Sequence, residues 1–228
     1  HEAKCVLAEY GITPTRESLA ANASDAVRAA DAIGYPVVLK VQSADIPHKT
    51  EAGGVRVGVA DAAAVARAFD EIVASARRHV PGARIDGVLV QEMVRGAVEV
   101  IVGVQDDPTF GPAVMVGLGG IHAEVMKDVT FRLAPLVPGE AAAMLREIRA
   151  FPLLDGARGA PKADVAALAD AVERAAALAV DLAGVVAELD INPLFVLPAG
   201  RGVRAGDALI RLHAQAAQAE PAAQANQA

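Results

Sequence analysis

A row of oxygen-bearing side chains near the C-terminal end of the chain could hold a divalent cation. Glu188, Asp190 and Asn192 occupy alternate positions within the stretch 185–207. Successive side chains of a β-strand point to opposite faces, so these three would share one face and the apolar residues between them the other. The spacing therefore predicts three oxygen donors side by side.

A turn signal and a returning segment follow this strand. Residues 198–202 read Pro-Ala-Gly-Arg-Gly, and the chain continues through Val203 toward Asp207. A hairpin centred near Gly200 would place Asn192 roughly opposite Asp207. Carboxylate and amide oxygens without His or Cys suit Mg²⁺ or Mn²⁺, and Mg²⁺ held by few protein ligands usually also carries substrate phosphates. The hairpin predicts a site for a metal-bound nucleotide; a solvated strand face beside a turn would explain the same spacing.

Composition indicates a globular protein and excludes some functions. The 228 residues are 54% hydrophobic but only 3% aromatic, so Ala, Val, Leu and Ile must build the core. The net charge of −7 argues against a nucleic-acid binder, although small phosphorylated ligands stay possible. The single cysteine, Cys5, cannot form an internal disulfide, and the sequence shows neither a signal peptide nor an apolar run of membrane-spanning length. We therefore expect a cytoplasmic protein without a membrane partner.

A second candidate lies in the first half of the chain. Residues 37–41 form an apolar run interrupted by Lys40, which predicts a central strand with a lysine that faces an anion or a carboxylate. The polar segment 42–54 predicts a mobile loop that ends in Gly53-Gly54, and the alternating residues 55–59 predict another strand. Two strands that flank such a loop can cover nucleotide phosphates. The residues alone leave His48, within this loop, as an exposed polar side chain.

The remaining segments predict an α+β protein with two lobes. Beside helices at 1–10, 139–150 and 163–183, we expect one that begins at Ser24 and one capped by Asp61. Strands at 88–94 and 98–104 would form a pair around Arg95-Gly96 and leave Glu99 on the outer face, where it could bind a ribose or simply be solvated. Gly119-Gly120 could admit a phosphate or form a plain turn. Further strands are expected at 113–117 and 131–135.

Several motifs in this order resemble one family. They read EAK and YGI near the start, then GYPVVLK, DIPHKTEAGGV, the run GVQDDPTFGPAVMVGLGGIHAEVMKDVTFRLAPL, and ELDINPL. Over about residues 2–212 the chain resembles the ATP-grasp subunit, or C-terminal region, of ADP-forming acyl-CoA synthetases, relatives of succinyl-CoA synthetase. The resemblance implies an ATP-grasp fold, in which two lobes clamp Mg-ATP or Mg-ADP, and the reaction acid + CoA + ATP = acyl-CoA + ADP + phosphate.

On this basis the chain is expected to have four parts. Residues 1–22 would be a helical segment that completes the grasp domain, residues 23–90 the first lobe, and residues 91–212 the second lobe with the metal hairpin. Residues 213–228 would be an Ala/Gln-rich tail.

The resemblance also implies roles for individual residues. His48 would be a relaying phosphohistidine, since imidazole is nucleophilic when neutral and a good leaving group when phosphorylated. Asp190 would take part in phosphoryl transfer, and Asn192 and Asp207 would bind the metal. The nucleotide would be held by Lys40, Gly53, Gly54, Gln91, Glu92, Met93, Val94, Glu99 and Arg132, with the four residues from Gln91 to Val94 at the adenine, Glu99 at the ribose and Arg132 as a further phosphate ligand. Gly119, Gly120 and Ile121 would receive the incoming phosphohistidine.

Two departures from the family pattern matter. Leu209 stands where the family often has Arg two residues after the metal-binding Asp. No Gly-rich CoA-binding unit and no acyl-phosphate half is found, so we expect a partner subunit or a further part of the same polypeptide, in a hetero-oligomer or a homo-oligomer of a fused chain. Two alternatives stay open: an ATP-grasp ligase that uses a direct acyl phosphate, and a nucleotide-sensing module of a larger acyltransferase protein.

Overall fold

The computed structural model describes residues 1–46, 48–120 and 128–214, and the chain divides into two compact units. Unit 1 comprises His1 and residues 15–95, and unit 2 comprises residues 2–14 and those from Gly96 onward. The expected boundary between residues 90 and 91 falls inside a strand of unit 1, and the N-terminal helix belongs to unit 2. Within the described residues, no helix is long and apolar enough to cross a membrane.

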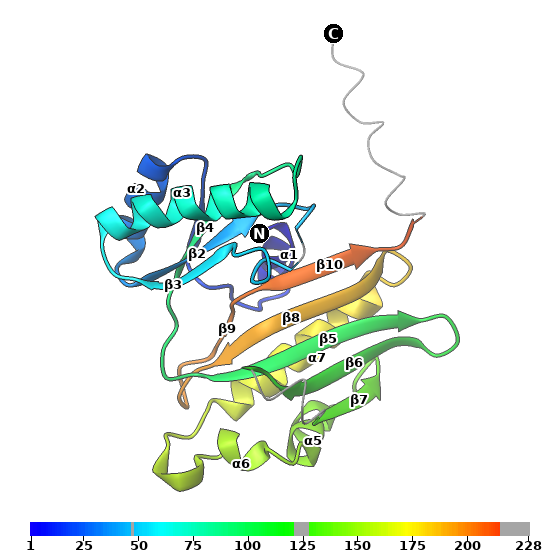
Figure 1. Cartoon of the computed structure of the whole chain (residues 1–228). Helices are drawn as coiled ribbons and strands as arrows, with labels where there is room; N and C mark the ends of the chain where they lie inside the picture. The colour runs from blue at the N-terminus through cyan, green and yellow to red at the C-terminus, as the bar shows by residue number, and fades with distance from the viewer. Residues whose placement is uncertain (47, 121–127, 215–228) are drawn as a thin grey trace. The chain divides into compact units, whose positions relative to one another are not determined.

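Unit 1 is an antiparallel sheet covered on one face by two helices (Figure 1). Its strands follow the order β1-β4-β2-β3, with bounds β1 Glu17–Ala20, β2 Val37–Gln42, β3 Val55–Val59 and β4 Gly87–Glu92. The predicted strand around Lys40 is therefore an interior strand, because β2 pairs with β3 and β4. Strand β1 was not expected: it has only four residues, and Ala20 alone is buried.

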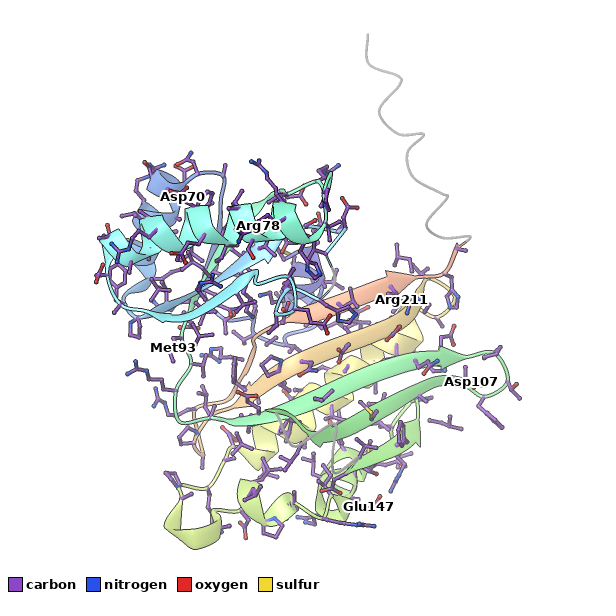
Figure 2. All side chains as sticks on the ribbon, viewed as in Figure 1. Asp70, Arg78, Met93, Asp107, Glu147 and Arg211 are labelled. Carbon is purple, nitrogen blue, oxygen red and sulfur yellow. The ribbon has the colours of Figure 1, made fainter. Side chains whose placement is uncertain are left out.

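The helices of unit 1 begin at side-chain caps. Helix α2 (Ala23–Ile33) begins after Asn22, whose side chain accepts from the Asp25 N–H, so the expected cap at Ser24 is wrong by two residues. Helix α3 (Ala62–His79) begins after Asp61, which accepts from the Ala64 N–H as expected. The apolar stripe of α3 packs on the sheet, while Asp70 and Arg78 are exposed (Figure 2).

Unit 2 is built on a larger antiparallel sheet. Its strands follow the order β10-β8-β5-β6-β7, with β9 paired to β8 beside this path, and the bounds are β5 Val98–Asp107, β6 Gly111–Leu118, β7 Val129–Leu133, β8 Val186–Val196, β9 Val203–Ala205 and β10 Ala208–Leu212. The expected pairing of 88–94 with 98–104 is wrong, because β4 and β5 lie in different sheets. A short Gly-containing connection predicts a hairpin locally but cannot show which strands are the better partners.

Helices cover one face of this second sheet. They are α1 (Glu2–Glu9), α5 (Glu140–Glu147), α6 (Phe151–Leu154), the 3₁₀ turn η2 (Ala157–Gly159) and α7 (Val165–Asp181), of which α7 runs along the sheet (Figure 1). Alternate strand residues such as Val102, Val116 and Ile191 form the core with α5 and α7. The opposite face of this sheet is not covered by the helices of unit 2 that the structure describes, so its side chains could contact a ligand.

Candidate functional site

The oxygen-donor row lies on the available face of β8, as the alternation predicted. Leu189 and Ile191 are buried in the core of unit 2, while Glu188 and Asp190 are half-buried and Asn192 is exposed. Across the sheet Asp190 pairs with Gly103 of β5 on one side and with Leu209 of β10 on the other. Leu209 therefore stands beside the acidic row as a half-exposed apolar side chain.

The returning chain brings Asp207 opposite Asn192. The Asn192 N–H donates to the Asp207 carbonyl oxygen at 3.1 Å, and the Gly206 N–H donates to the Pro193 carbonyl oxygen at 2.9 Å. The Ala208 N–H donates to Oδ1 of Asp207 at 3.0 Å, which holds that carboxylate close to its own backbone. The predicted opposition of Asn192 and Asp207 is confirmed at the level of the backbone.

Two other carboxylates, Glu188 and Asp207, lie close enough to Asp190 to affect its protonation. Burial raises the pKa of the Asp190 carboxyl, and the negative charges of Glu188 and Asp207 raise it further. Gly103, the cross-strand neighbour, has no side chain, and a Cβ there would lie 3.1 Å from Cε of Met115. A close set of hard oxygen donors of this kind fits Mg²⁺ or Mn²⁺.

Few protein ligands are offered to such a cation. Over the described part of the chain, no group of three or more His, Cys, Asp or Glu is arranged to hold a metal ion. One amide and one carboxylate, Asn192 and Asp207, are the predicted ligands, which fits a metal that brings phosphate oxygens and water with it.

The loop that carries His48 joins β2 to β3 and is anchored to unit 1. Ile46 and Ala52 are buried in the core at 2% exposure each, so they fix the two sides of the loop. The Ala52 N–H donates to the His48 carbonyl oxygen at 3.3 Å, and Oδ2 of Asp45 accepts from the Arg84 N–H at 2.8 Å. The His48 side chain itself is exposed, which suits a group that must be reached by a partner.

The paired glycines at the end of this loop are required by packing. A Cβ on Gly53 would lie 2.6 Å from Oγ of Ser75 on α3, and one on Gly54 would lie 2.5 Å from Cγ1 of Val41. The Gly54 carbonyl oxygen accepts from the Val41 N–H at 2.8 Å, so the loop closes directly onto β2. Close packing explains both glycines, and their predicted contact with the nucleotide stays a prediction.

Lys40 lies on β2 near this closure. Its side chain is half-buried, and in the sheet it pairs with Val55 on one side and Leu89 on the other. It also makes an interaction within the protein. The expected interior strand is confirmed, and an anion as the ligand of Lys40 stays a prediction.

The predicted adenine segment begins with two engaged side chains. Nε2 of Gln91 donates to Oγ1 of Thr15 at 2.6 Å and to Oε2 of Glu17 at 3.1 Å, and Gln91 is buried at 2% exposure. Oε2 of Glu92 accepts from Nε of Arg16 at 2.9 Å. Both side chains therefore fasten β4 to the segment 15–17, while Met93 and Val94 are half-buried beyond the strand.

Glu99 lies against the Gly119-Gly120 pair. The Gly119 N–H donates to the Glu99 carbonyl oxygen at 2.8 Å, and a Cβ on Gly119 would lie 3.1 Å from the Glu99 carbonyl carbon. Gly120 has a φ of +74°, and a Cβ there would lie 3.3 Å from Oε2 of Glu99. The structure thus brings together the predicted ribose contact and part of the segment predicted to receive a phosphohistidine; Ile121 lies outside the described residues.

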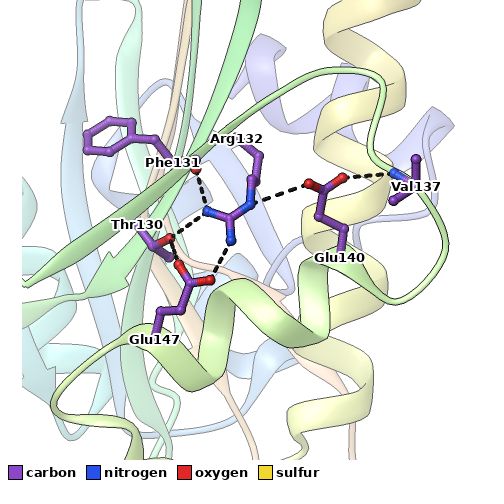
Figure 3. Close-up of polar contacts among 6 residues, drawn as sticks. All are labelled: Thr130, Phe131, Arg132, Val137, Glu140 and Glu147. Atoms are coloured by element: carbon purple, nitrogen blue, oxygen red, sulfur yellow. Dashed lines mark hydrogen bonds and ion pairs between the residues drawn. The ribbon is translucent and has the colours of Figure 1, made fainter.

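Arg132 is held by two carboxylates of α5 (Figure 3). Its guanidinium donates to Glu147 and to the Phe131 carbonyl oxygen, and its Nε lies 3.3 Å from Oε1 of Glu140. The bond to Glu147 raises the pKa of Arg132, and the same bond lowers the pKa of Glu147. A phosphate would have to compete with these carboxylates, so the structure offers Arg132 a role in joining β7 to α5.

Two residues that position these elements were missed in the sequence. Gly103 opens the strand face beside Asp190, and a glycine within an apolar strand pattern is a signal of close approach. Asp164 caps α7 and also binds the turn after β8: Oδ1 accepts from the Ala167 N–H at 3.2 Å, and Oδ2 accepts from the Gly202 N–H at 2.8 Å. An Asp just before a helical pattern is a capping signal, but its second partner lies 38 positions away.

The fold places the chain in the ATP-grasp class of proteins. The chain matches the family model described as ATP-grasp domain over residues 1–212, and it belongs to this family.

Curated relatives of the chain include CoA ligases. It is 42% identical to acetate–CoA ligase [ADP-forming] II subunit beta of Pyrococcus furiosus, over 93% of this chain and 90% of that protein. It is 44% identical to 4-hydroxybutyrate–CoA ligase [ADP-forming] of Nitrosopumilus maritimus, over 92% of this chain. The chain spans only 30% of that second relative, so it corresponds to a whole subunit in one protein and to a part in another.

A solved structure is also similar to this chain in both sequence and fold. The dinucleotide-forming acetyl-coenzyme A synthetase 1 of Ca. Korarchaeum cryptofilum, in complex with coenzyme A and Mg-AMPPCP, is 39% identical with a TM-score of 0.80. The match covers 93% of this chain and 91% of that chain. In that protein the phosphohistidine segment points towards the nucleotide-binding site.

Proposed function

We propose that this chain is the ATP-binding part of an ADP-forming acyl-CoA synthetase, which catalyses acid + CoA + ATP = acyl-CoA + ADP + phosphate. The match along nearly the whole of a relative named as a beta subunit carries the proposal. The oxygen-donor row on β8 and the exposed His48 support it, because they supply the metal ligands and the nucleophile that the reaction needs. The CoA-binding and acyl-phosphate functions belong to a partner subunit or to another part of a longer chain.

In the proposed relay, His48 carries the phosphoryl group. A neutral ring nitrogen of His48 attacks the γ-phosphorus of ATP, an N–P bond forms, the bond from phosphorus to the β-phosphate oxygen breaks, and ADP leaves. A ring nitrogen of a histidine on the CoA-binding part then attacks the same phosphorus, and His48 recovers its lone pair. The phosphoryl group finally passes to the acid substrate on that part and gives the acyl phosphate that CoA attacks.

Charges on this chain would make the transfer possible. Lys40 would bind the nucleotide phosphates, and Asp190 would take part in phosphoryl transfer. Asn192 and Asp207 would hold Mg²⁺ or Mn²⁺, and such a cation neutralises charge on the phosphate oxygens when it is bound.

The other predicted residues would orient the nucleotide and the partner. The residues from Gln91 to Val94 would contact adenine, and Glu99 would contact the ribose. The side chains of Gln91 and Glu92 already bind residues 15–17, so we assign their adenine contact to the backbone. Gly119 and Gly120, packed on Glu99, would admit the incoming phosphohistidine.

Labelling with ATP tests the proposal directly. The chain is incubated with Mg²⁺ and ATP labelled at the γ-phosphate, and acid-labile, base-stable protein phosphate is measured. We expect label on the wild type and on His79→Ala, a control at another exposed histidine, but none on His48→Ala. Calorimetric titration of Mg-ADP should give similar affinities for all three proteins, because none of these changes alters a nucleotide ligand.

Two results would contradict the proposal. Label that persists on His48→Ala would remove His48 from the relay. A wild type that binds Mg-ATP but never becomes labelled, even with the CoA-binding partner added, would instead favour a nucleotide-sensing module.

A further inference from the structure

The N-terminal helix carries a lysine inside the core of unit 2. Lys4 lies on α1 and is 2% exposed. Burial of an ammonium group costs free energy unless its N–H groups find acceptors, and lysine is among the residues least often buried. Leu7, one turn later on the same face, is fully buried and already packs the helix against the core. Packing alone therefore gives no reason for a charged group at position 4.

The ammonium group of Lys4 reaches the segment that holds the predicted metal ligand. Nζ donates to the Gly206 carbonyl oxygen at 3.3 Å, across 202 positions of sequence. That carbonyl belongs to the peptide group that joins Gly206 to Asp207, and a peptide group is planar. A hydrogen bond to this carbonyl oxygen therefore restricts the orientation of the whole peptide group, and with it the position of the Asp207 Cα.

Other contacts hold the neighbouring groups of this segment. The Ala205 N–H donates to the Thr13 carbonyl oxygen at 2.9 Å, and the Asn192 N–H donates to the Asp207 carbonyl oxygen. Gly206 itself is packed so closely that a Cβ would lie 2.4 Å from Cε2 of Phe195. The backbone before Asp207 is thus fixed from one side by residues 4 and 13 and from the other by β8.

From these contacts we propose that Lys4 is a positioning residue for Asp207 as a metal ligand. The inference rests on the proposed function, in which Asp207 and Asn192 bind the cation that accompanies the nucleotide. In this role Lys4 sets the direction in which the Asp207 carboxylate leaves the backbone. Loss of a group that orients a metal ligand typically lowers metal affinity by about 10- to 100-fold.

The test compares ADP binding with Mg²⁺ and with EDTA by calorimetry on the full chain. The quantity of interest is the dissociation constant with EDTA divided by the dissociation constant with Mg²⁺. This ratio reports how much the metal strengthens ADP binding, and changes that affect only the nucleotide cancel in it. Lys4→Met keeps an unbranched side chain of nearly the same length and removes its donor. Leu7→Ala is the matched control, because it weakens the packing of the same helix without touching Gly206. Asp207→Ala gives the ratio expected when the ligand itself is lost.

We expect Lys4→Met to reduce this ratio about tenfold, while Leu7→Ala lowers the melting temperature and keeps the wild-type ratio. Lys4→Arg, which restores a donor, should recover part of the loss. If Lys4→Met does not fold, Lys4→Leu, which also lacks a donor, is measured in its place. An unchanged ratio in the donor-free variant, or an equal loss in Leu7→Ala, would overturn the positioning role. A wild-type ratio of one would overturn the proposed function itself, and this inference with it.

Discussion

Replacement of Asp164 by alanine should destabilise unit 2 strongly, because one carboxylate serves two elements. It caps α7 through the Ala167 N–H and holds the turn after β8 through the Gly202 N–H at 2.8 Å. Loss of an N-cap costs about 1 kcal/mol and loss of a hydrogen bond to a charged acceptor about 2 kcal/mol, so we expect a decrease of about 3 kcal/mol in the free energy of unfolding.

The pH dependence of a second variant, Asp164→Asn, provides an independent check. The backbone N–H of Gly202, followed by other backbone N–H groups, lowers the pKa of the Asp164 carboxyl below its usual value. A group whose pKa is lowered in the folded state contributes its stability above its unfolded pKa of about 3.9 and loses it as the pH falls through the folded pKa. The difference between wild type and Asp164→Asn should therefore be largest near neutral pH and should shrink in acid.

Urea unfolding followed by circular dichroism measures both effects. Asp170→Ala is the matched control: Asp170 lies on α7 and forms a surface ion pair with Arg174 at 2.7 Å, so we expect a change below about 0.5 kcal/mol. If Asp164→Ala costs no more than Asp170→Ala, or if the difference from wild type grows as the pH falls, the double role of Asp164 is refuted.

Two further predictions concern the candidate site. Arg132→Met should lower the melting temperature at neutral pH, because it leaves the carboxylates of Glu140 and Glu147 near each other without a cation between them. Arg132 lowers the pKa of Glu147, so this loss of stability should fade as the pH falls through the lowered pKa of Glu147. A large loss of nucleotide affinity in this variant would instead favour the phosphate-binding role of Arg132. Gly206→Ala should lower both the melting temperature and the Mg²⁺-dependent affinity for ADP, because its Cβ would overlap the ring of Phe195, and unchanged values in both measurements would contradict this reasoning.

Local patterns in the sequence were enough to place the pieces of the site. Alternation alone put Asp190 and Asn192 on one strand face, and an apolar run placed Lys40 on an interior strand. The cap at Asp61 was equally clear, because its signal and its partner lie three positions apart. Such features depend on neighbours in sequence, which the amino-acid order displays directly.

Features that depend on distant partners could not be predicted in this way. Strand β1 carries almost no pattern of its own and forms because β4 offers it an edge. The assignment of β4 and β5 to different sheets, and the burial of Lys4 at Gly206, follow from contacts that no local window contains. Ser24 is a good cap by residue type, and the observed cap at Asn22 lies two positions earlier, which is within the uncertainty of a helix start.

The division of the chain has a consequence for the order in which it folds. Residues 2–14 belong to unit 2, so the whole of residues 15–95 is an insertion between the first helix of that unit and the rest of it. During synthesis unit 1 is complete long before β9 and β10 leave the ribosome, and α1, with only eight residues, is too short to be stable alone. Helix α1 is therefore made before unit 1 but docks among the last elements of unit 2, and the segment that carries Asp207 reaches its final form only after α1 has docked.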